Sequence, residues 1–106
     1  MIFVETPLFT LQIQSLVDDD GYSRFQRHLA ENPEAGDLIK GTGGLRKIRM
    51  ALPGRGKSGG ARVIYYYLHK AAEIRLLLAY AKSSQDDLTE AQRKALKQIV
   101  ASWSRL

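Results

Sequence analysis

The sequence has no cysteine, so neither disulfide bonds nor thiolate metal ligands can contribute to its fold or chemistry. It has two histidines, His28 and His69, and neither forms a recognisable metal-binding motif. The longest apolar runs, near Val63 and Leu76, are far shorter than a membrane span, and the N-terminus has no basic signal-peptide start. These absences predict a cytoplasmic protein with no metal site, no cofactor and no membrane contact.

Acidic residues are missing from residues 38–72, although the 106-residue sequence contains 11 of them. The formal net charge of the whole chain is +5, and this acid-free block alone carries eight bases. A concentrated positive region favours binding of a polyanion over the alternative, an ordinary solvated face. The bases of the block are Lys40, Arg46, Lys47, Arg49, Arg55, Lys57, Arg62 and Lys70.

The block includes Gly56-Lys57-Ser58, which is similar to the end of a phosphate-binding nucleotide loop. The glycine that should open that motif is replaced by Ala51. The residues that follow, RVIYYYL, are β-branched and aromatic and therefore predict a strand, whereas a nucleotide loop opens a helix. We therefore interpret this segment as the tip of a hairpin and not as a nucleotide site.

Hydrophobic periodicity predicts a single α+β domain, residues 1–106, with N-terminal helices, a central antiparallel sheet and a C-terminal helix. Residues 1–6 fit a short strand. A first helix follows Pro7 and ends near Val17, and the acids of residues 18–20 can cap a second helix that ends at Asn32-Pro33. The glycine-rich residues 34–44 are expected to be a connector.

Three strands at hairpin spacing are predicted for residues 45–52, 61–68 and 73–81. In the first of them, Lys47 and Arg49 alternate with apolar residues and so share one face. The last helix is marked by Thr89 and Gln92 at capping-box spacing, followed by Ala95, Leu96, Ile99, Val100 and Trp103 at helical spacing.

The basic block contains no acid, so an enzyme built on it must work with lysine, arginine and tyrosine. Cleavage of RNA suits this set, because the substrate's own 2′-hydroxyl is the nucleophile and cations can neutralise the phosphorane. Tyr65, Tyr66, Tyr67 and Tyr80 can stack on bases or donate a proton, although packing within the sheet is the commoner role of such residues. At least one of the three consecutive tyrosines must face each side of the sheet.

Two segments carry a family resemblance. Together they resemble the HigB branch of the RelE-type bacterial toxins of toxin–antitoxin systems. The first segment is NPEAGDLIKGTGGLRKIRMALPGRGKSGGARVIYYYL and the second is LLLAYAKSSQDDLTEAQRK. The resemblance implies a metal-independent ribonuclease that cuts translated mRNA in the ribosomal A site. It also implies a cognate HigA-like antitoxin with a helix-turn-helix domain, through which contact with DNA would be indirect.

The resemblance also assigns residues. The family's basic pair falls on Lys47 and Arg49, its next arginine on Arg62, and its last basic residue on Lys82, with Tyr80 just before it. We expect these residues around one concave basic surface, although alternation puts Arg62 with Ile64 and Tyr66, so that a bulge near the loop is one solution. Contacts to RNA or the ribosome are expected from Arg46, Arg55, Lys57, Tyr66 and Lys40.

Several alternatives stay open at this point. Ser83 and, approximately, Leu88 replace an arginine and a tyrosine of the RelE archetype, so the general acid is either Tyr80 or Lys82. A ParE-like toxin that acts on DNA gyrase would share the architecture but lack the basic set, and a non-catalytic RNA- or ribosome-binding module would only grip phosphates. The antitoxin is expected on the basic surface or on the acidic N-terminal helices.

Overall fold

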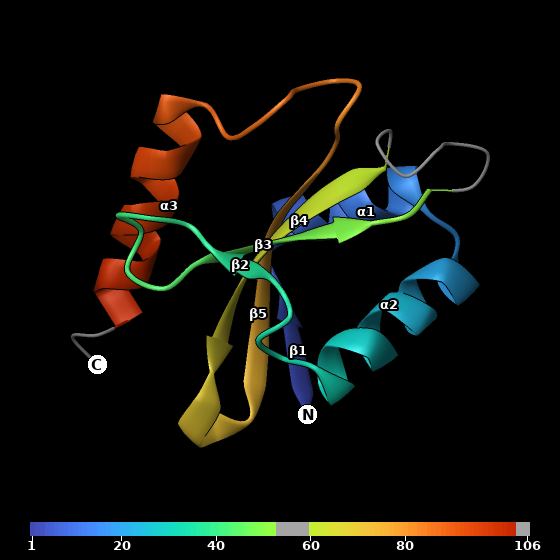
Figure 1. The fold of residues 1–106 in the computed structure, drawn as a ribbon, viewed down its shortest axis with the longest axis horizontal. Coiled ribbons are helices and arrows are strands. Elements are labelled where there is room, and N and C mark those ends of the chain that lie inside the picture. The colour runs from blue at the N-terminus through green and yellow to red at the C-terminus, as the bar shows by residue number, and fades with distance from the viewer. Residues whose placement is uncertain (53–59, 104–106) are drawn as a thin grey trace.

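The computed structural model describes residues 1–52 and 60–103 of the chain. Within them, five strands form one mixed sheet in the order β1-β5-β4-β3-β2. Helices α1 and α2 cover one face of this sheet and α3 covers the other (Figure 1). The α+β class predicted from the sequence is confirmed. Among the described residues, no helix is both long and apolar enough to cross a membrane.

The three central strands form the predicted antiparallel meander. They are β3 (Arg46–Met50), β4 (Ala61–Leu68) and β5 (Glu73–Ala81). A short 3-10 helix, His69–Ala71, joins β4 to β5 and ends at Ala72, which has a φ of +48°. β3 is shorter than the predicted residues 45–52.

Two edge strands complete the sheet and correct the sequence prediction. β1 (Ile2–Glu5) pairs with β5 in parallel, so the sheet is mixed and not purely antiparallel. β2 (Asp37–Leu38) lies within the expected connector and pairs with Arg46 and Lys47. Because both β2 side chains are exposed and the strand has two residues, no alternation of apolar residues marks it in the sequence.

Both N-terminal helices begin and end where the sequence predicts. α1 (Pro7–Leu16) starts after Thr6, whose hydroxyl accepts a hydrogen bond from the Phe9 N–H at 3.0 Å. α2 (Asp19–Glu31) starts after Asp18, whose carboxylate accepts from the Gly21 N–H at 2.8 Å. Each cap satisfies a backbone donor that the first turn of a helix leaves free.

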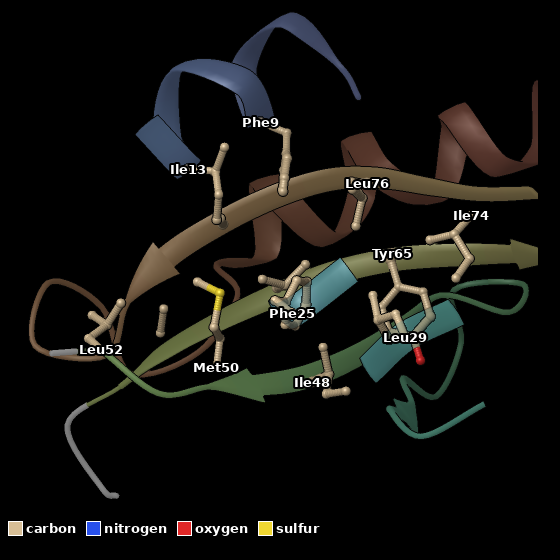
Figure 2. Packing of buried hydrophobic residues seen from close by; sticks show 13 residues of the cluster. Phe9, Ile13, Phe25, Leu29, Ile48, Met50, Leu52, Tyr65, Ile74 and Leu76 are labelled. Carbon is tan, nitrogen blue, oxygen red and sulfur yellow. The ribbon is translucent and has the colours of Figure 1, made fainter. Parts of the chain in front are cut away.

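The core between these helices and the sheet is apolar (Figure 2). Phe9 and Ile13 of α1 and Phe25 and Leu29 of α2 are buried against the sheet. The sheet contributes Ile48, Met50, Ala61, Val63, Tyr65, Ile74, Leu76 and Ala79. Alternation then directs the neighbouring residues of β3 and β4 to the opposite face, which α3 covers.

The second core lies under α3 (Glu90–Trp103). The predicted capping box is present, because Thr89 and Gln92 each accept a hydrogen bond from the other's backbone N–H. Leu96 and Val100 are buried against Leu45, Ile64, Leu77, Leu78, Tyr80 and Leu88. Ala95 and Ile99, which share the helical spacing, are exposed.

A bulge is present, but not near the hairpin loop where we expected one. Ile64 pairs with Leu78 and Tyr65 with Leu76, so Leu77 is the extra residue in β5. Leu77 and Leu78 both enter the core under α3. The side chain of Gln12 in α1 accepts a hydrogen bond from the Ala79 N–H at 2.9 Å, just beyond the bulge.

Candidate active site

Three residues of the expected catalytic set form a row across the sheet. Arg49 of β3 pairs with Arg62 of β4, which pairs with Tyr80 of β5. Residues directly opposite one another share a face, so all three lie on the α3 side. Lys47 lies two residues before Arg49 and opposite Ile64, and therefore on the same face.

Arg62 is buried, with 7% of its surface exposed. Its guanidinium donates a hydrogen bond to the Ala61 carbonyl at 3.2 Å, and no carboxylate of the described residues forms an ion pair with it. Burying an arginine without a counter-charge costs free energy, so the fold tolerates this residue at the expense of stability. The expectation of an open groove at Arg62 is therefore wrong for this conformation.

Tyr80 is also buried, with 6% of its surface exposed. Its hydroxyl has no hydrogen-bond partner among the described residues, which is unusual for a buried polar atom. Burial is the main cause that raises the pKa of Tyr80, and Asp87 raises it further, while Arg62 acts in the opposite direction. Near neutral pH the residue is thus a protonated phenol beside a guanidinium.

The segment between β5 and α3, residues 82–89, packs against this end of the face. Leu88 is buried in the same cluster as Tyr80. Lys47 Nζ lies 3.2 Å from Asp87 Oδ1, and that oxygen accepts a hydrogen bond from the Leu88 N–H at 2.8 Å. This bond is the main cause that lowers the pKa of Asp87, with Lys47 contributing in the same direction and desolvation opposing.

Sequence reasoning gave no role to Asp87, because the basic block itself contains no acid. The acid comes from a distant segment, 40 residues after Lys47. One signal in the sequence could have found it: Asp86 and Asp87 lie within three residues of the capping box at Thr89, in the short segment between β5 and α3.

Lys82 directly follows β5. Its backbone N–H donates to the Gly60 carbonyl at 3.0 Å, so the pairing of β4 and β5 continues beyond the end of the strand. Alternation then places Lys82 on the side of Tyr80. The register thus brings Lys47, Arg49, Arg62, Tyr80 and Lys82 to one end of one sheet face, while their catalytic roles stay predictions.

The residues expected to contact RNA are more scattered. Arg46 faces the α1 and α2 side, since it pairs with Tyr65, and it donates hydrogen bonds to the carbonyls of Glu34 and Gly36. Tyr66 lies under α3 with its ring 5.3 Å from that of Trp103, and Lys40 is exposed. Arg55 and Lys57 lie outside the described residues.

The three tyrosines of β4 divide between the faces as alternation predicts. Tyr65 and Tyr67 pack with the core of α1 and α2, and Tyr66 packs under α3. The hydroxyl of Tyr65 donates to the Pro33 carbonyl at 2.8 Å and accepts from the Gly36 N–H at 2.9 Å. In residues 1–52 and 60–103, no group of three or more His, Cys, Asp or Glu is placed to hold a metal ion.

The family model of the RelE toxin of the RelE/RelB toxin–antitoxin system matches residues 26–106 of the sequence. This chain belongs to the RelE toxin family. It is thus a RelE-type toxin of a toxin–antitoxin system.

Solved structures of E. coli RelE share the fold. The isolated toxin matches with 16% identity and a TM-score of 0.59, over 92% of this chain and 97% of that chain. A double arginine-to-alanine mutant of E. coli RelE in the free state matches with 12% identity and a TM-score of 0.56, over 80% of this chain and 86% of that chain. The intact E. coli RelBE toxin–antitoxin complex matches with 15% identity and a TM-score of 0.55, over 74% of this chain and 92% of that chain.

Proposed function

We propose that this toxin is a metal-independent endoribonuclease that cuts translated mRNA in the ribosomal A site. The observation that carries the proposal is the row of Arg49, Arg62 and Tyr80, two cations and a protonated phenol on one face of the sheet. Family membership supports the same function, and the resemblance to the HigB branch refines it. The proposed place of action is the cytoplasm.

The proposed chemistry starts from the 2′-hydroxyl of the RNA, which loses its proton to solvent water as its oxygen attacks the adjacent phosphorus. The bond from phosphorus to the 5′-oxygen breaks, leaving a 2′,3′-cyclic phosphate and a new 5′-hydroxyl. Negative charge grows on the phosphoryl oxygens along this path. The guanidinium groups of Arg62 and Arg49 would stabilise that charge, a contribution of about 2–4 kcal/mol per lost donor at comparable sites.

The leaving 5′-oxygen needs a proton, and Tyr80 suits this role better than that of a base. Its raised pKa keeps the hydroxyl protonated near neutral pH, and the hydroxyl has no partner among the described residues. Lys82 is the second candidate, since it follows on the same side of the sheet. General acid catalysis of this kind contributes about 10²–10⁴-fold in rate.

We infer that the segment 82–89 moves to admit RNA to this row. Arg62 and Tyr80 are both more than nine-tenths buried, so a phosphate cannot reach them in the closed arrangement. Lys47 is positioned to exchange its partner, because the substrate phosphate can replace the Asp87 carboxylate. We propose that ribosome and mRNA together favour the open arrangement.

The proposed partner in the resting cell is a HigA-like antitoxin with a helix-turn-helix domain, which would provide the only link to DNA. Two surfaces suit it, the basic face around Lys47 and the acidic N-terminal part of α2. Charge reversal of Asp18, Asp19 and Asp20 to lysine separates them. Unchanged affinity for the antitoxin excludes the acidic surface, and a large loss excludes docking on the basic face alone.

Two other functions make different predictions. A ParE-like gyrase inhibitor has no need of a positive charge at Arg62, and a non-catalytic RNA-binding module would arrest growth without a cut product. The deciding experiment is induction of the toxin in bacteria with mapping of mRNA 5′ ends. Cleavage within translated codons that Arg62→Ala abolishes supports the proposal, while growth arrest without new 5′ ends contradicts it.

A further inference from the structure

Two adjoining hollows lie along α3, at the other end of the face that carries the candidate active site. The larger, about 600 Å³, lies between the turn that follows β4 and the C-terminal half of α3. The smaller, about 400 Å³, lies between the loop at Gly41 and the N-terminal half of α3. Lys97 lines both hollows, so they adjoin, and the two together are here called the α3 groove.

The charged residues that line the α3 groove are nearly all basic. Arg93, Lys94 and Lys97 come from α3 and Lys70 comes from the turn, with Glu90 as the single acid among the lining residues. The three lysines are exposed. None of these four bases formed part of the sequence-based site. A groove with this charge complements a polyanion.

The wall at the far end of the groove is aromatic. Tyr66 and Trp103 both line it, with their rings in an edge contact at 5.3 Å. The guanidinium of Arg75 lies 4.4 Å from the centre of the Trp103 ring and holds it in place. Aromatic side chains beside a line of cations are typical of surfaces that bind single-stranded nucleic acid.

The α3 groove lies near the candidate active site. Arg93 lines the groove and is close enough to Asp87, the partner of Lys47, to add to the lowering of the pKa of Asp87, after the larger effects of the Leu88 N–H and Lys47. On the sheet, Arg62 and Tyr66 share a face of β4 and lie four residues apart, or about 13 Å at the rise of a strand. An RNA strand that reaches Arg62 in the open arrangement proposed above is therefore long enough to reach the α3 groove as well.

We propose that the α3 groove binds the segment of the substrate RNA strand that flanks the cleaved phosphate. The proposal rests on the function proposed above. Lys97 and Lys70 contact the phosphates, and the aromatic wall of Tyr66 and Trp103 packs against a base. Proximity to the active-site row favours the substrate strand over ribosomal RNA, and the lysines on both walls suit a phosphate backbone that runs between them.

The test measures binding of the toxin to ribosomes programmed with two mRNAs, one that ends at the A-site codon and one that extends beyond it. Both carry a 2′-deoxy nucleotide at the cleavage position, which removes the nucleophile, so binding is measured without cutting. We expect Lys97→Glu to weaken binding to the longer mRNA complex about tenfold and to lower the salt dependence, by about 0.7 in slope per lost phosphate contact.

The matched control is Arg27→Glu, an equal charge change at an exposed position of α2 on the other side of the sheet. We expect binding within about twofold of wild type, since long-range charge effects are screened in salt. An equal loss for Lys97→Glu on both mRNAs would assign the groove to ribosomal RNA and overturn the proposal. The proposal would also be overturned if Lys97→Glu bound both mRNA complexes as wild type does, or if it lost only antitoxin binding.

This outcome is independent of catalysis. If wild-type toxin cuts no mRNA in cells but Lys97→Glu removes the gain in binding from the longer mRNA, the nuclease proposal fails and the α3 groove stands. If cleavage occurs and Lys97→Glu binds both complexes as wild type does, the groove proposal fails alone.

Discussion

Arg49 and Arg62 lie directly opposite each other on adjacent antiparallel strands, so two like charges share one end of a sheet face. Like charges in this position destabilise a sheet, and Arg62 is in addition buried without a carboxylate partner among the described residues. A sequence selected for stability alone would not keep this pair. The arrangement is expected where a site must receive a phosphate.

Replacing Arg62 separates stability from function. In Arg62→Met, we expect the free energy of unfolding to rise by about 1 kcal/mol or to stay unchanged, because a buried charge is replaced by an apolar chain of similar length. The cleavage rate should fall by the factor that corresponds to a loss of about 2–4 kcal/mol of transition-state stabilisation. Urea unfolding and mRNA cleavage on ribosomes measure the two quantities.

Arg49→Met is the comparison for this experiment, because Arg49 is exposed on the same face and its removal should leave stability within about 0.5 kcal/mol. A loss of several kcal/mol of stability in Arg62→Met would show instead that the buried guanidinium holds the fold together.

Tyr80→Phe tests the general acid. The hydroxyl of Tyr80 has no described hydrogen-bond partner, so its removal should leave the free energy of unfolding unchanged or raise it slightly. Cleavage should fall by about 10²–10⁴-fold if Tyr80 protonates the leaving oxygen. If single-turnover cleavage is unaffected, the role passes to Lys82.

Tyr65→Phe should have the opposite effects from Tyr80→Phe, because it should lower stability and leave cleavage intact. The hydroxyl of Tyr65 is bonded to the Pro33 carbonyl and the Gly36 N–H on the far side of the sheet. Its loss leaves these backbone groups unsatisfied, so stability should fall by about 1–3 kcal/mol. The chemical step should be preserved below the unfolding transition, and a large loss of cleavage in the fully folded variant would contradict the assignment of the site to the α3 side.

Gln12→Ala tests how the bulge in β5 is held. The Gln12 side chain accepts a hydrogen bond from the Ala79 N–H, next to Tyr80. We expect a loss of about 1–3 kcal/mol of stability, because the amide is left unsatisfied at a buried position. Gln14→Ala, at an exposed position of the same helix, should change the free energy of unfolding by less than about 0.5 kcal/mol. Equal effects of the two substitutions in thermal unfolding would show that the bulge does not need this bond.

Local signals predicted the helices and the three central strands, because helix caps, helix-breaking residues and strand alternation depend only on residues that are close together in the sequence. Thr89 and Gln92 form the capping box that their spacing indicates, and Lys47 and Arg49 share the face that alternation assigns. The pairing of β1 with β5 was not predictable in this way, since it joins segments about 70 residues apart and depends on how the helices pack.

The burial of the site also escaped the sequence. Alternation grouped Arg62 with Ile64 and Tyr66, which already suggested a partly apolar setting. Leu88 packs in the cluster that buries Tyr80, and the path of the segment around Leu88 depends on the docking of α3. The ion pair of Lys47 with Asp87 has the same origin, because no local pattern links residues 40 positions apart.

The ion pair between Lys47 and Asp87 can be tested by replacing the acid. Asp87→Asn removes the charge that holds Lys47 but keeps an oxygen that can accept from the Leu88 N–H. If the pair helps to keep the segment 82–89 closed over Arg62 and Tyr80, the variant should cleave mRNA faster. An exposed ion pair is worth at most about 1 kcal/mol, so the gain should not exceed about fivefold. Asp86→Asn, an equal charge change one residue earlier, should raise the rate less.

The pH dependence has a defined sign. The pKa of Asp87 is lowered in the folded protein, so the pair is intact above the ordinary carboxyl range and is lost as the pH falls through the lowered pKa. The cleavage rate of Asp87→Asn relative to wild type should therefore be constant around neutral pH, because Asp87 stays ionised there. A fall in cleavage of more than about tenfold in Asp87→Asn, with folding intact, would show that the carboxylate takes part in the reaction and is not merely a contact that closes the site.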